Sequence, residues 1–317
     1  MNGSGTFRFA GKPIPRGTRR QVSLPAGRLP SGTEVSLPIE ILNGVASGPT
    51  IWLSGALHGD EIVGVEIIRR VLEHVDERSL TGVIVAAPVV NVFGFVTGSR
   101  YLPDRRDLNR SFPGTTRGPL AGRIARLFVD EVLAVADVGI DFHAGSDERT
   151  NLPQIRGNMD DEGTRALALA FGAPLAIHSK TIKGSLRETA LRLGKRVLLF
   201  EGGEPRRFSP EAVDAGVAGT LRVLAALGMI GDRATSADPP VESRSTTWVR
   251  APRGGIFRLE TRLGERVTKG ERLGIITGPS GRGGREVRAP VTGIVMGHAV
   301  NPLVHQGDAL VHVADIG

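Results

Sequence analysis

The 317-residue sequence contains no cysteine, which excludes disulfide bonds, thiolate metal ligands and cysteine nucleophiles. Any metal ion bound by this chain must therefore be held by nitrogen and oxygen atoms. Aromatic residues make up only 4% of the chain, and they form no stacking platform of the kind that binds single-stranded nucleic acid. No apolar run in the sequence approaches the roughly 20 residues of a membrane-spanning helix. We therefore expect neither a nucleic-acid partner nor a membrane partner.

Lysine is also scarce, and nearly all of the 40 basic residues are arginines. The net charge is +7, but the arginines are scattered along the chain rather than gathered in one basic stretch. A locally positive pocket for an anionic small molecule explains this balance better than a nucleic-acid surface. Residues 1–10 lack the apolar core of a secretion signal, so we expect a cytoplasmic protein. The sequence leaves homo-oligomerisation open.

Hydrophobic periodicity predicts an α/β fold in which strands and helices alternate. Helical spacing of apolar residues occurs over 60–75, 120–135, 162–171 and 210–227. Short apolar or alternating runs predict strands at 34–41, 50–54, 83–90, 138–142, 175–177 and 196–200. This order predicts a three-layer domain with helices on both faces of a mixed central sheet.

Composition divides the chain into four parts. Residues 1–34 are rich in Gly, Pro and Arg and are predicted to form an irregular arm before a main domain at 35–230. Residues 231–247 are rich in Asp, Pro, Ser and Thr and lack periodicity, so we expect a linker there. The remainder, 248–317, has short β-type runs and many glycines, which predicts a small all-β domain.

The predicted C-terminal domain contains an internal repeat. Residues 249–257 (VRAPRGGIF) match 287–295 (VRAPVTGIV), and 267–273 (VTKGERL) match 304–310 (VHQGDAL). Two copies at a near-constant offset predict two similar β halves packed on one another. This segment resembles the biotinyl/lipoyl-type sandwich, whose members carry a modifiable lysine at a hairpin tip. The corresponding stretch here, 278–284, has no lysine, so we expect a structural or lid domain rather than a carrier arm.

Two segments carry side chains suited to a metal site. His58 and Glu61 follow one apolar run at a spacing of three, and His143 ends another apolar run. Together they supply two imidazoles and one carboxylate, a set that catalytic zinc takes while keeping one position open for water. We expect Glu61 on the first turn of a helix and His58 in the loop before it. Each residue alone also fits a plain structural role, as a helix-capping glutamate or a hydrogen-bonded core histidine.

Two other segments suggest substrate contacts and a base. Arg110 lies beside Asn109, and its planar guanidinium suits two-point contact with a carboxylate. Arg100 lies upstream, where a second cation would face a polarised carbonyl, although solvated arginines in a Pro/Gly loop fit equally well. Glu201 ends an apolar run, so burial is expected to raise its pKa and suit it to general-base catalysis. The alternative for Glu201 is an ion pair with a nearby arginine.

These motifs resemble, in order and approximate spacing, those of the succinylglutamate desuccinylase/aspartoacylase family, part of the wider zinc carboxypeptidase group. The motifs are His58-Gly-Asp-Glu61, Asp107-Leu-Asn-Arg110, His143 and Glu201. The resemblance spans roughly residues 50–227, and family members often carry a C-terminal β-domain. It implies a zinc-carboxypeptidase-like domain with one Zn²⁺ ion per chain. The ligands that it implies are His58, Glu61 and His143.

The same resemblance implies roles for four further residues. Asn109 and Arg110 correspond to the residues that hold the substrate carboxylate, and Arg100 to the one beside the scissile carbonyl. Glu201 corresponds to the general base. We also expect Arg156, in a predicted loop, to contact the substrate. The remaining histidines have no motif context and are expected to be structural or surface residues; they are His74, His178, His298, His305 and His312.

The sequence thus predicts a zinc-dependent hydrolase that cleaves the amide bond of an N-acyl amino acid or a similar small carboxylate-bearing substrate. A zinc carboxypeptidase or amidase acting on short or modified peptides would share the same ligands and differ in the shape of its pocket. A non-catalytic binding protein on a hydrolase fold is less favoured, because the expected ligands and base are all present.

Overall fold

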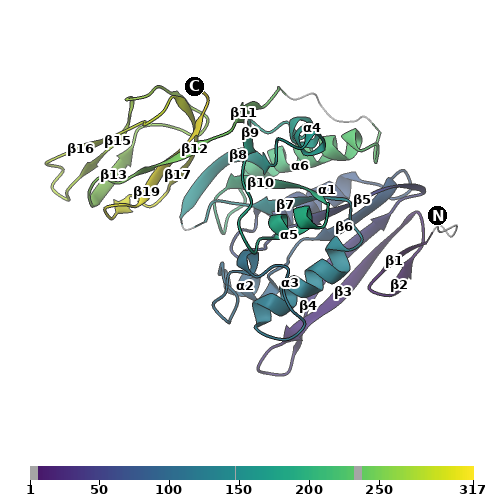
Figure 1. Ribbon diagram of the computed structural model, residues 1–317. Coiled ribbons are helices and arrows are strands. Elements are labelled where there is room, and N and C mark those ends of the chain that lie inside the picture. The colour runs from purple at the N-terminus through teal and green to yellow at the C-terminus, as the bar shows by residue number, and fades with distance from the viewer. Residues whose placement is uncertain (1–5, 147, 232–237) are drawn as a thin grey trace.

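Strands and helices alternate along most of the chain, and the C-terminal part is built of strands (Figure 1). The computed structural model describes residues 6–146, 148–231 and 238–317. The helices are α1 (Val63–His74), α2 (Val92–Thr97), α3 (Leu120–Phe128), α4 (Glu162–Phe171), α5 (Leu186–Arg192) and α6 (Pro210–Ala226). The earlier strands are β1 (Phe7–Phe9), β2 (Lys12–Ile14), β3 (Thr18–Arg28), β4 (Glu34–Asn43), β5 (Ala46–Ser54), β6 (Thr81–Ala87), β7 (Val138–His143), β8 (Arg149–Gly157), β9 (Leu175–His178) and β10 (Arg196–Gly203). The later strands are β11 (Val241–Ser243), β12 (Thr246–Arg250), β13 (Gly255–Leu259), β14 (Arg266–Val267), β15 (Arg272–Thr277), β16 (Arg285–Arg288), β17 (Gly293–Ala299), β18 (Leu303–Val304) and β19 (Ala309–Asp315).

One large mixed sheet joins the two ends of the chain. Its strand order is β12-β19-β17-β8-β10-β7-β5-β6-β4-β3. The central strands β10, β7, β5 and β6 are parallel, so their carboxyl ends meet at one edge, where open α/β sheets place their sites. The C-terminal strand β17 pairs with β8, and the sheet therefore continues from the α/β part into the β-domain.

Helices cover both faces of the α/β part of this sheet (Figure 1). On β5, Ile51 and Leu53 pack into the core formed with α1, α4 and α6, whereas Trp52 between them faces the core formed with α3 and α5. This alternation is the period of two that a strand imposes on its side chains. The predicted α/β class with a mixed central sheet is confirmed. None of the described helices is long and apolar enough to cross a membrane.

The N-terminal segment differs from its prediction as an irregular arm over 1–34. Strands β1 and β2 form an antiparallel pair, and β3 pairs along nearly the whole length of β4. Pro25 lies inside β3, which obscured the alternation of its buried side chains in the sequence. Proline is tolerated there because β3 lies at the edge of the sheet. Residues 1–5 lie outside the described part of the chain.

Several other elements refine the sequence-based boundaries. The helix predicted over 60–75 begins at Val63, and the segment predicted as a loop before Arg156 is strand β8. Helices α2 and α5 are too short to give a periodic signal, and neither was predicted. Of the linker predicted over 231–247, residues 232–237 lie outside the described part, and β11 pairs with β9 in the remainder.

The C-terminal strands reproduce the sequence repeat. Strands β13, β14 and β15 of the first copy correspond to β17, β18 and β19 of the second. The short strand of each copy pairs with a strand of the other copy, because β14 pairs with β17 and β18 pairs with β13. One sheet carries β16-β15-β13-β18, and the other is the end of the large sheet, with a shared apolar core between them. The predicted all-β character and the packing of two similar halves are confirmed.

Candidate active site

The loop after β5 carries the first candidate ligand, His58. Ala56 has a left-handed φ of 45°, a costly conformation for a residue with a Cβ and one that persists where the surroundings fix the backbone. Gly59 lies against α2, so closely that a Cβ on it would be 2.0 Å from the carbonyl carbon of Gly94. The loop is therefore held by backbone contacts that leave little freedom in the position of His58.

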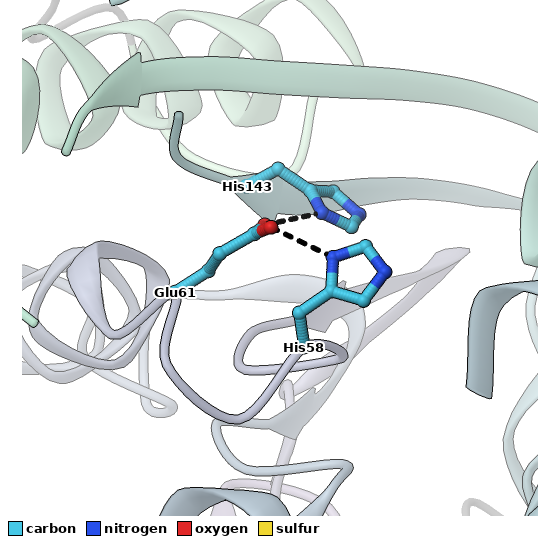
Figure 2. Close-up of side chains that lie close together, drawn as sticks. All are labelled: His58, Glu61 and His143. Carbon is cyan, nitrogen blue, oxygen red and sulfur yellow. Dashed lines mark hydrogen bonds and ion pairs between the residues drawn. The ribbon is translucent and has the colours of Figure 1, made fainter. Parts of the chain in front are cut away.

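His58, Glu61 and His143 converge from two distant parts of the chain (Figure 2). Nδ1 of His58 lies 2.8 Å from Oε1 of Glu61, and Nδ1 of His143 lies 2.7 Å from Oε2 of the same carboxylate. All three residues are buried, and one ligand atom from each lies within 4.8 Å of the others. Two imidazole nitrogens and a carboxylate oxygen at this spacing fit a divalent cation such as Zn²⁺. Glu61 lies just before the helix N-cap Ile62, in the loop rather than on the first helical turn, where it was predicted.

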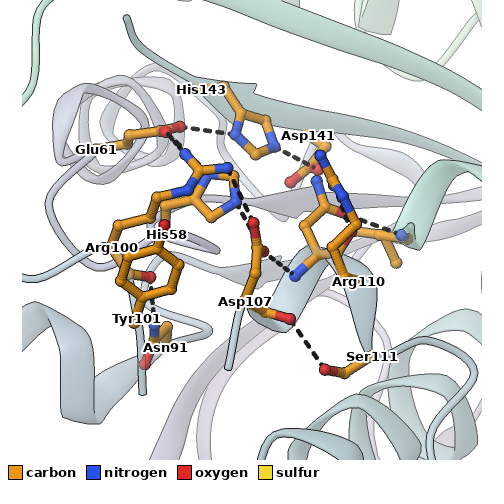
Figure 3. A network of polar contacts seen from close by, with 12 residues as sticks. His58, Glu61, Asn91, Arg100, Tyr101, Asp107, Arg110, Ser111, Asp141 and His143 are labelled. Atoms are coloured by element: carbon orange, nitrogen blue, oxygen red, sulfur yellow. Dashed lines mark hydrogen bonds and ion pairs between the residues drawn. The ribbon is translucent and has the colours of Figure 1, made fainter. Parts of the chain in front are cut away.

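Each imidazole turns its second nitrogen toward another carboxylate (Figure 3). Nε2 of His143 lies 2.9 Å from Asp141, whose other oxygen accepts a hydrogen bond of 2.7 Å from the hydroxyl of Ser54. Nε2 of His58 lies 3.2 Å from Asp107. Such carboxylates orient the imidazoles that bind metals and raise their basicity. This donor set, with its ordered outer carboxylates, fits a metal ion.

The electrostatics of this group follow from burial and close opposite charges. Burial acts to lower the pKa values of His58 and His143, but the neighbouring carboxylates outweigh it and raise both. Burial acts to raise the pKa of Glu61, and attraction to the two imidazoles outweighs it, so that pKa is lowered. The pKa of Asp107 is lowered in the same way, by its contact with His58 and the nearby arginines against the effect of burial.

Glu201 lies on the strand next to His143. Strands β10 and β7 are parallel, and the two Cα atoms are paired in register, so both side chains leave the sheet on the same face. Burial is the largest influence on the pKa of Glu201 and raises it, although Arg156 and His143 oppose this. The direction agrees with the sequence-based prediction. Nδ2 of Asn151 donates a hydrogen bond of 3.0 Å to Oε2 of Glu201.

The predicted substrate residues lie around the same group. Arg100 donates to Glu61 and to Asp107, both at 3.0 Å, so its guanidinium lies directly against the carboxylate of this candidate ligand (Figure 3). Oδ1 of Asn109 accepts from a backbone N–H of α5 at 2.9 Å. Arg110 lies beside it and donates to its backbone carbonyl.

These side chains line one cavity of about 260 Å³. It brings together all eight residues predicted for the site, which are His58, Glu61, Arg100, Asn109, Arg110, His143, Arg156 and Glu201. Lys180 and Arg187 also line it, and no sequence pattern marked either of them. Burial and the nearby Arg156 lower the pKa of Arg187 to about 10. Among the described residues, neither Arg156 nor Arg187 has a carboxylate within ion-pair distance of 4.0 Å.

The C-terminal domain supplies one wall of this cavity. The rings of Trp248 and His312 stack with centroids 4.2 Å apart, and the guanidinium of Arg149 lies 5.2 Å from the Trp248 ring centroid. His312, expected from the sequence to be a structural or surface residue, is buried and lines the cavity. Burial, with the nearby arginines, lowers the pKa of His312 to about 3, so its imidazole is neutral. No motif in the sequence marks this wall.

The fold and the cavity define an α/β protein with a buried His-Glu-His group, which fits a divalent cation, beside a buried glutamate. The family model of the succinylglutamate desuccinylase/aspartoacylase catalytic domain matches residues 47–227. The chain therefore belongs to this family, which confirms the resemblance seen in the motifs. It is an amidohydrolase, an enzyme class to which its named relatives also belong.

Three relatives cover nearly the whole chain. The N-alpha-acetyl-L-2,4-diaminobutyric acid deacetylase of Halomonas elongata is 27% identical over 296 residues, which is 89% of this chain and 86% of that protein. The crystal structure of a succinylglutamate desuccinylase/aspartoacylase from Rhodobacter sphaeroides is 29% identical, with a TM-score of 0.84 over 95% of this chain and 97% of that one. The product-bound ectoine utilization protein EutE (DoeB) from Ruegeria pomeroyi is 26% identical, with a TM-score of 0.86 and coverages of 96% and 98%.

Proposed function

We propose that the protein is a zinc-dependent deacylase that hydrolyses the amide bond of an N-acyl amino acid or a similar small substrate bearing a carboxylate. The observation that carries this proposal is the convergence of His58, Glu61 and His143 within 4.8 Å in the cavity that Glu201 also lines. When bound by these three side chains, Zn²⁺ polarises the acyl carbonyl and acidifies a water molecule. The deacetylase relative from Halomonas elongata supports the same reaction class.

Glu201 is the proposed general base. Its raised pKa suits it to accept a proton from the attacking water and to return that proton to the leaving amine. The attack breaks the C–N amide bond and forms a new C–O bond, so the products are a carboxylic acid and an amine. Arg100, already close to the ligand Glu61, is the proposed donor to the carbonyl oxygen as negative charge develops on it.

Asn109 and Arg110 are the proposed holders of the substrate carboxylate. Both line the cavity, and Oδ1 of Asn109 is fixed by its hydrogen bond to the backbone N–H of Leu186. A substrate gripped at its carboxylate presents its amide in a constant position, which replaces a diffusive encounter with a fixed geometry. The guanidinium of Arg110 suits this role because its fork of donors matches two carboxylate oxygens.

The charge of the cavity favours a substrate with a second negative group. Besides Arg110, the cavity presents Arg156 and Arg187, which have no carboxylate within 4.0 Å among the described residues. The described carboxylates that line it are Glu61 and Glu201, and both already have proposed roles. An ammonium group on the substrate therefore has no remaining described carboxylate to pair with. We expect N-acyl derivatives of acidic amino acids, or amides of dicarboxylic acids, to be better substrates than N-acetyl-2,4-diaminobutyrate.

Metal analysis and a substrate panel test this proposal. Purified protein is expected to hold close to one zinc ion per chain. The panel compares N-acetyl and N-succinyl amino acids with dipeptides of similar size, and faster turnover of the N-acyl compounds is expected. Faster turnover of dipeptides would favour the carboxypeptidase alternative. Absence of bound metal, together with no hydrolysis after zinc is added, would refute the proposal.

A further inference from the structure

The proposed base and the C-terminal domain share one face of the continuous sheet. Strand β8 lies between β10 and β17, and Asn151 on β8 is the Cα partner of Gly203 on one side and of Gly297 on the other. On β17, Gly297 is in turn the partner of His312 on β19. Directly opposed residues of antiparallel strands present their side chains on the same face. A row of paired residues therefore runs from Gly203 across Asn151 and Gly297 to His312, and Glu201 lies two residues before the start of this row, at a register shift in β10.

Asn151 is the link in this row. Its amide donates a 3.0 Å hydrogen bond to Oε2 of Glu201, and its side chain is buried, with 8% of the residue exposed. Among the described residues, Asn151 is the only hydrogen-bond partner of the Glu201 carboxylate. The contact fixes one carboxylate oxygen and leaves Oε1 available to accept a proton. A neutral amide fixes the carboxylate oxygen without changing the net charge of the cavity. An arginine in the same place would add a positive charge.

Gly297 provides the space in which the Asn151 amide lies. A Cβ built on Gly297 would be 2.6 Å from Oδ1 of Asn151, closer than side-chain carbons approach such an atom. The next nearest atom is the carbonyl oxygen of Thr150 at 3.2 Å, a tight but smaller conflict. A methyl group at this position therefore acts mainly on the end of the Asn151 side chain, which is free to rotate away.

We propose that the C-terminal domain positions the general base, through Gly297 and Asn151. Strand β17 leaves room for the Asn151 amide at Gly297, and this amide holds the Glu201 carboxylate in the orientation that accepts the proton from water. Gly297 and Asn151 are positioning residues, because neither is assigned a contact with the reacting atoms. The inference rests on the proposed role of Glu201 and extends it to a domain that lies outside the family's catalytic match at residues 47–227.

A double-mutant cycle tests this inference. Asn151→Ala and Gly297→Ala are each expected to lower kcat about 10- to 100-fold, with KM changed less than about twofold, because a small displacement of a catalytic group costs turnover rather than binding. In the double variant, the methyl group added at position 297 has no Asn151 amide to displace. The kcat of the double variant is therefore expected to equal that of Asn151→Ala alone.

Controls separate this outcome from a general loss of structure. Gly254→Ala, in the same domain, meets its nearest neighbour at an ordinary 3.4 Å and is expected to keep wild-type kcat. Asn151→Leu keeps the approximate size of the side chain and adds no charge but removes the donor, so a low kcat in this variant shows that the hydrogen bond matters rather than packing. Melting temperatures of all variants are recorded alongside.

Each outcome bears on a definite claim. Three results would each overturn the positioning role. They are losses of kcat that multiply in the double variant, an unchanged kcat in Asn151→Ala, and a raised KM at constant kcat. The last of these would make Asn151 a substrate-binding residue instead. Wild-type kcat in Glu201→Gln would overturn the base assignment itself. This failure is distinguishable from a failure of the positioning role, because the variant does not alter β17 or Asn151.

Discussion

The two sides of the cavity differ in whether their positively charged groups contact a carboxylate. On the ligand side lie His58, Glu61, Arg100, Asp107, Asp141 and His143. On the base side lie Asn151, Arg156, Arg187, Glu201, Trp248 and His312. Every imidazole and guanidinium on the ligand side contacts a carboxylate. On the base side, Arg156 and Arg187 have no such partner among the described residues, and Glu201 is held by a neutral amide.

This difference separates two tasks that a hydrolytic site must perform. Paired charges hold their own geometry without a substrate, as a metal site requires, because each carboxylate fixes its neighbour. Guanidinium groups that line a cavity without a carboxylate partner favour an anionic ligand, which would supply the missing negative charge. We therefore expect changes on the ligand side to affect metal content, and changes on the base side to affect turnover or substrate choice with the metal retained.

The largest expected effect on the base side comes from Glu201→Gln. Removal of a general base costs about 10²- to 10⁴-fold, so kcat is expected to fall by about three orders of magnitude. Zinc content should stay at the wild-type value, because the proposed ligands His58, Glu61 and His143 are unchanged. Steady-state kinetics and metal analysis of the same preparation check both statements. Loss of zinc in this variant would place Glu201 on the ligand side and remove the contrast.

On the ligand side, Asp141→Asn should act through the metal. The carboxylate of Asp141 lies 2.9 Å from Nε2 of His143, and loss of such a partner costs about 10- to 100-fold in metal affinity. Competition with a chelator measures the change. Asp137→Asn is the matched control, since Asp137 precedes the opposite end of β7 and its carboxylate, among the described residues, accepts a hydrogen bond only from the backbone N–H of Thr50. Equal zinc affinities in the two variants would contradict the role given to Asp141.

Arg156→Gln should alter substrate choice more than turnover. N-acetylglutamate and N-acetylglutamine have nearly the same shape and differ in one negative charge. The variant is expected to raise KM for N-acetylglutamate about tenfold or more, the worth of a hydrogen bond to a charged group, and to change KM for N-acetylglutamine little. Arg20→Gln, on the edge strand β3, serves as the control. An equal change for both substrates would show that Arg156 does not contact the second charge.

The smallest expected effect concerns stability and pH. Burial raises the pKa of Glu201 in the folded protein, so below the ordinary pKa of glutamate both folded and unfolded chains hold the proton. As pH rises through the raised pKa, the unfolded chain loses the proton more readily, and stability falls. In metal-free protein, Glu201→Gln should therefore raise Tm by a few degrees at neutral pH and leave it nearly unchanged near pH 4. A lower Tm at neutral pH would show that the carboxylate stabilises the fold.

Much of the α/β part was predictable because its strands are buried on both faces and its long helices are amphipathic. The helix over 162–171 was predicted with the bounds that the structure has, since its apolar spacing and the capping residue Asp161 agree. Strand β3 was not predicted, because Pro25 and its flanking polar residues resemble a loop until β4 supplies a partner. Strand pairing is a long-range property, and local sequence does not encode it.

The sequence by itself predicted the three candidate ligands, because His58 and Glu61 are close along the chain and His143 ends an apolar run. On the base side the sequence predicted Glu201 and Arg156, and only the tertiary structure decided which residues surround them. Asn151, Arg187 and His312 come from a strand, a short helix and a separate β-domain, and none belongs to a motif. They meet Glu201 because the sheet continues from β10 through β8 into β17 and β19. The physical reason is that a cavity wall is made by the pairing of strands distant in sequence, whereas a ligand loop is made by its own few residues.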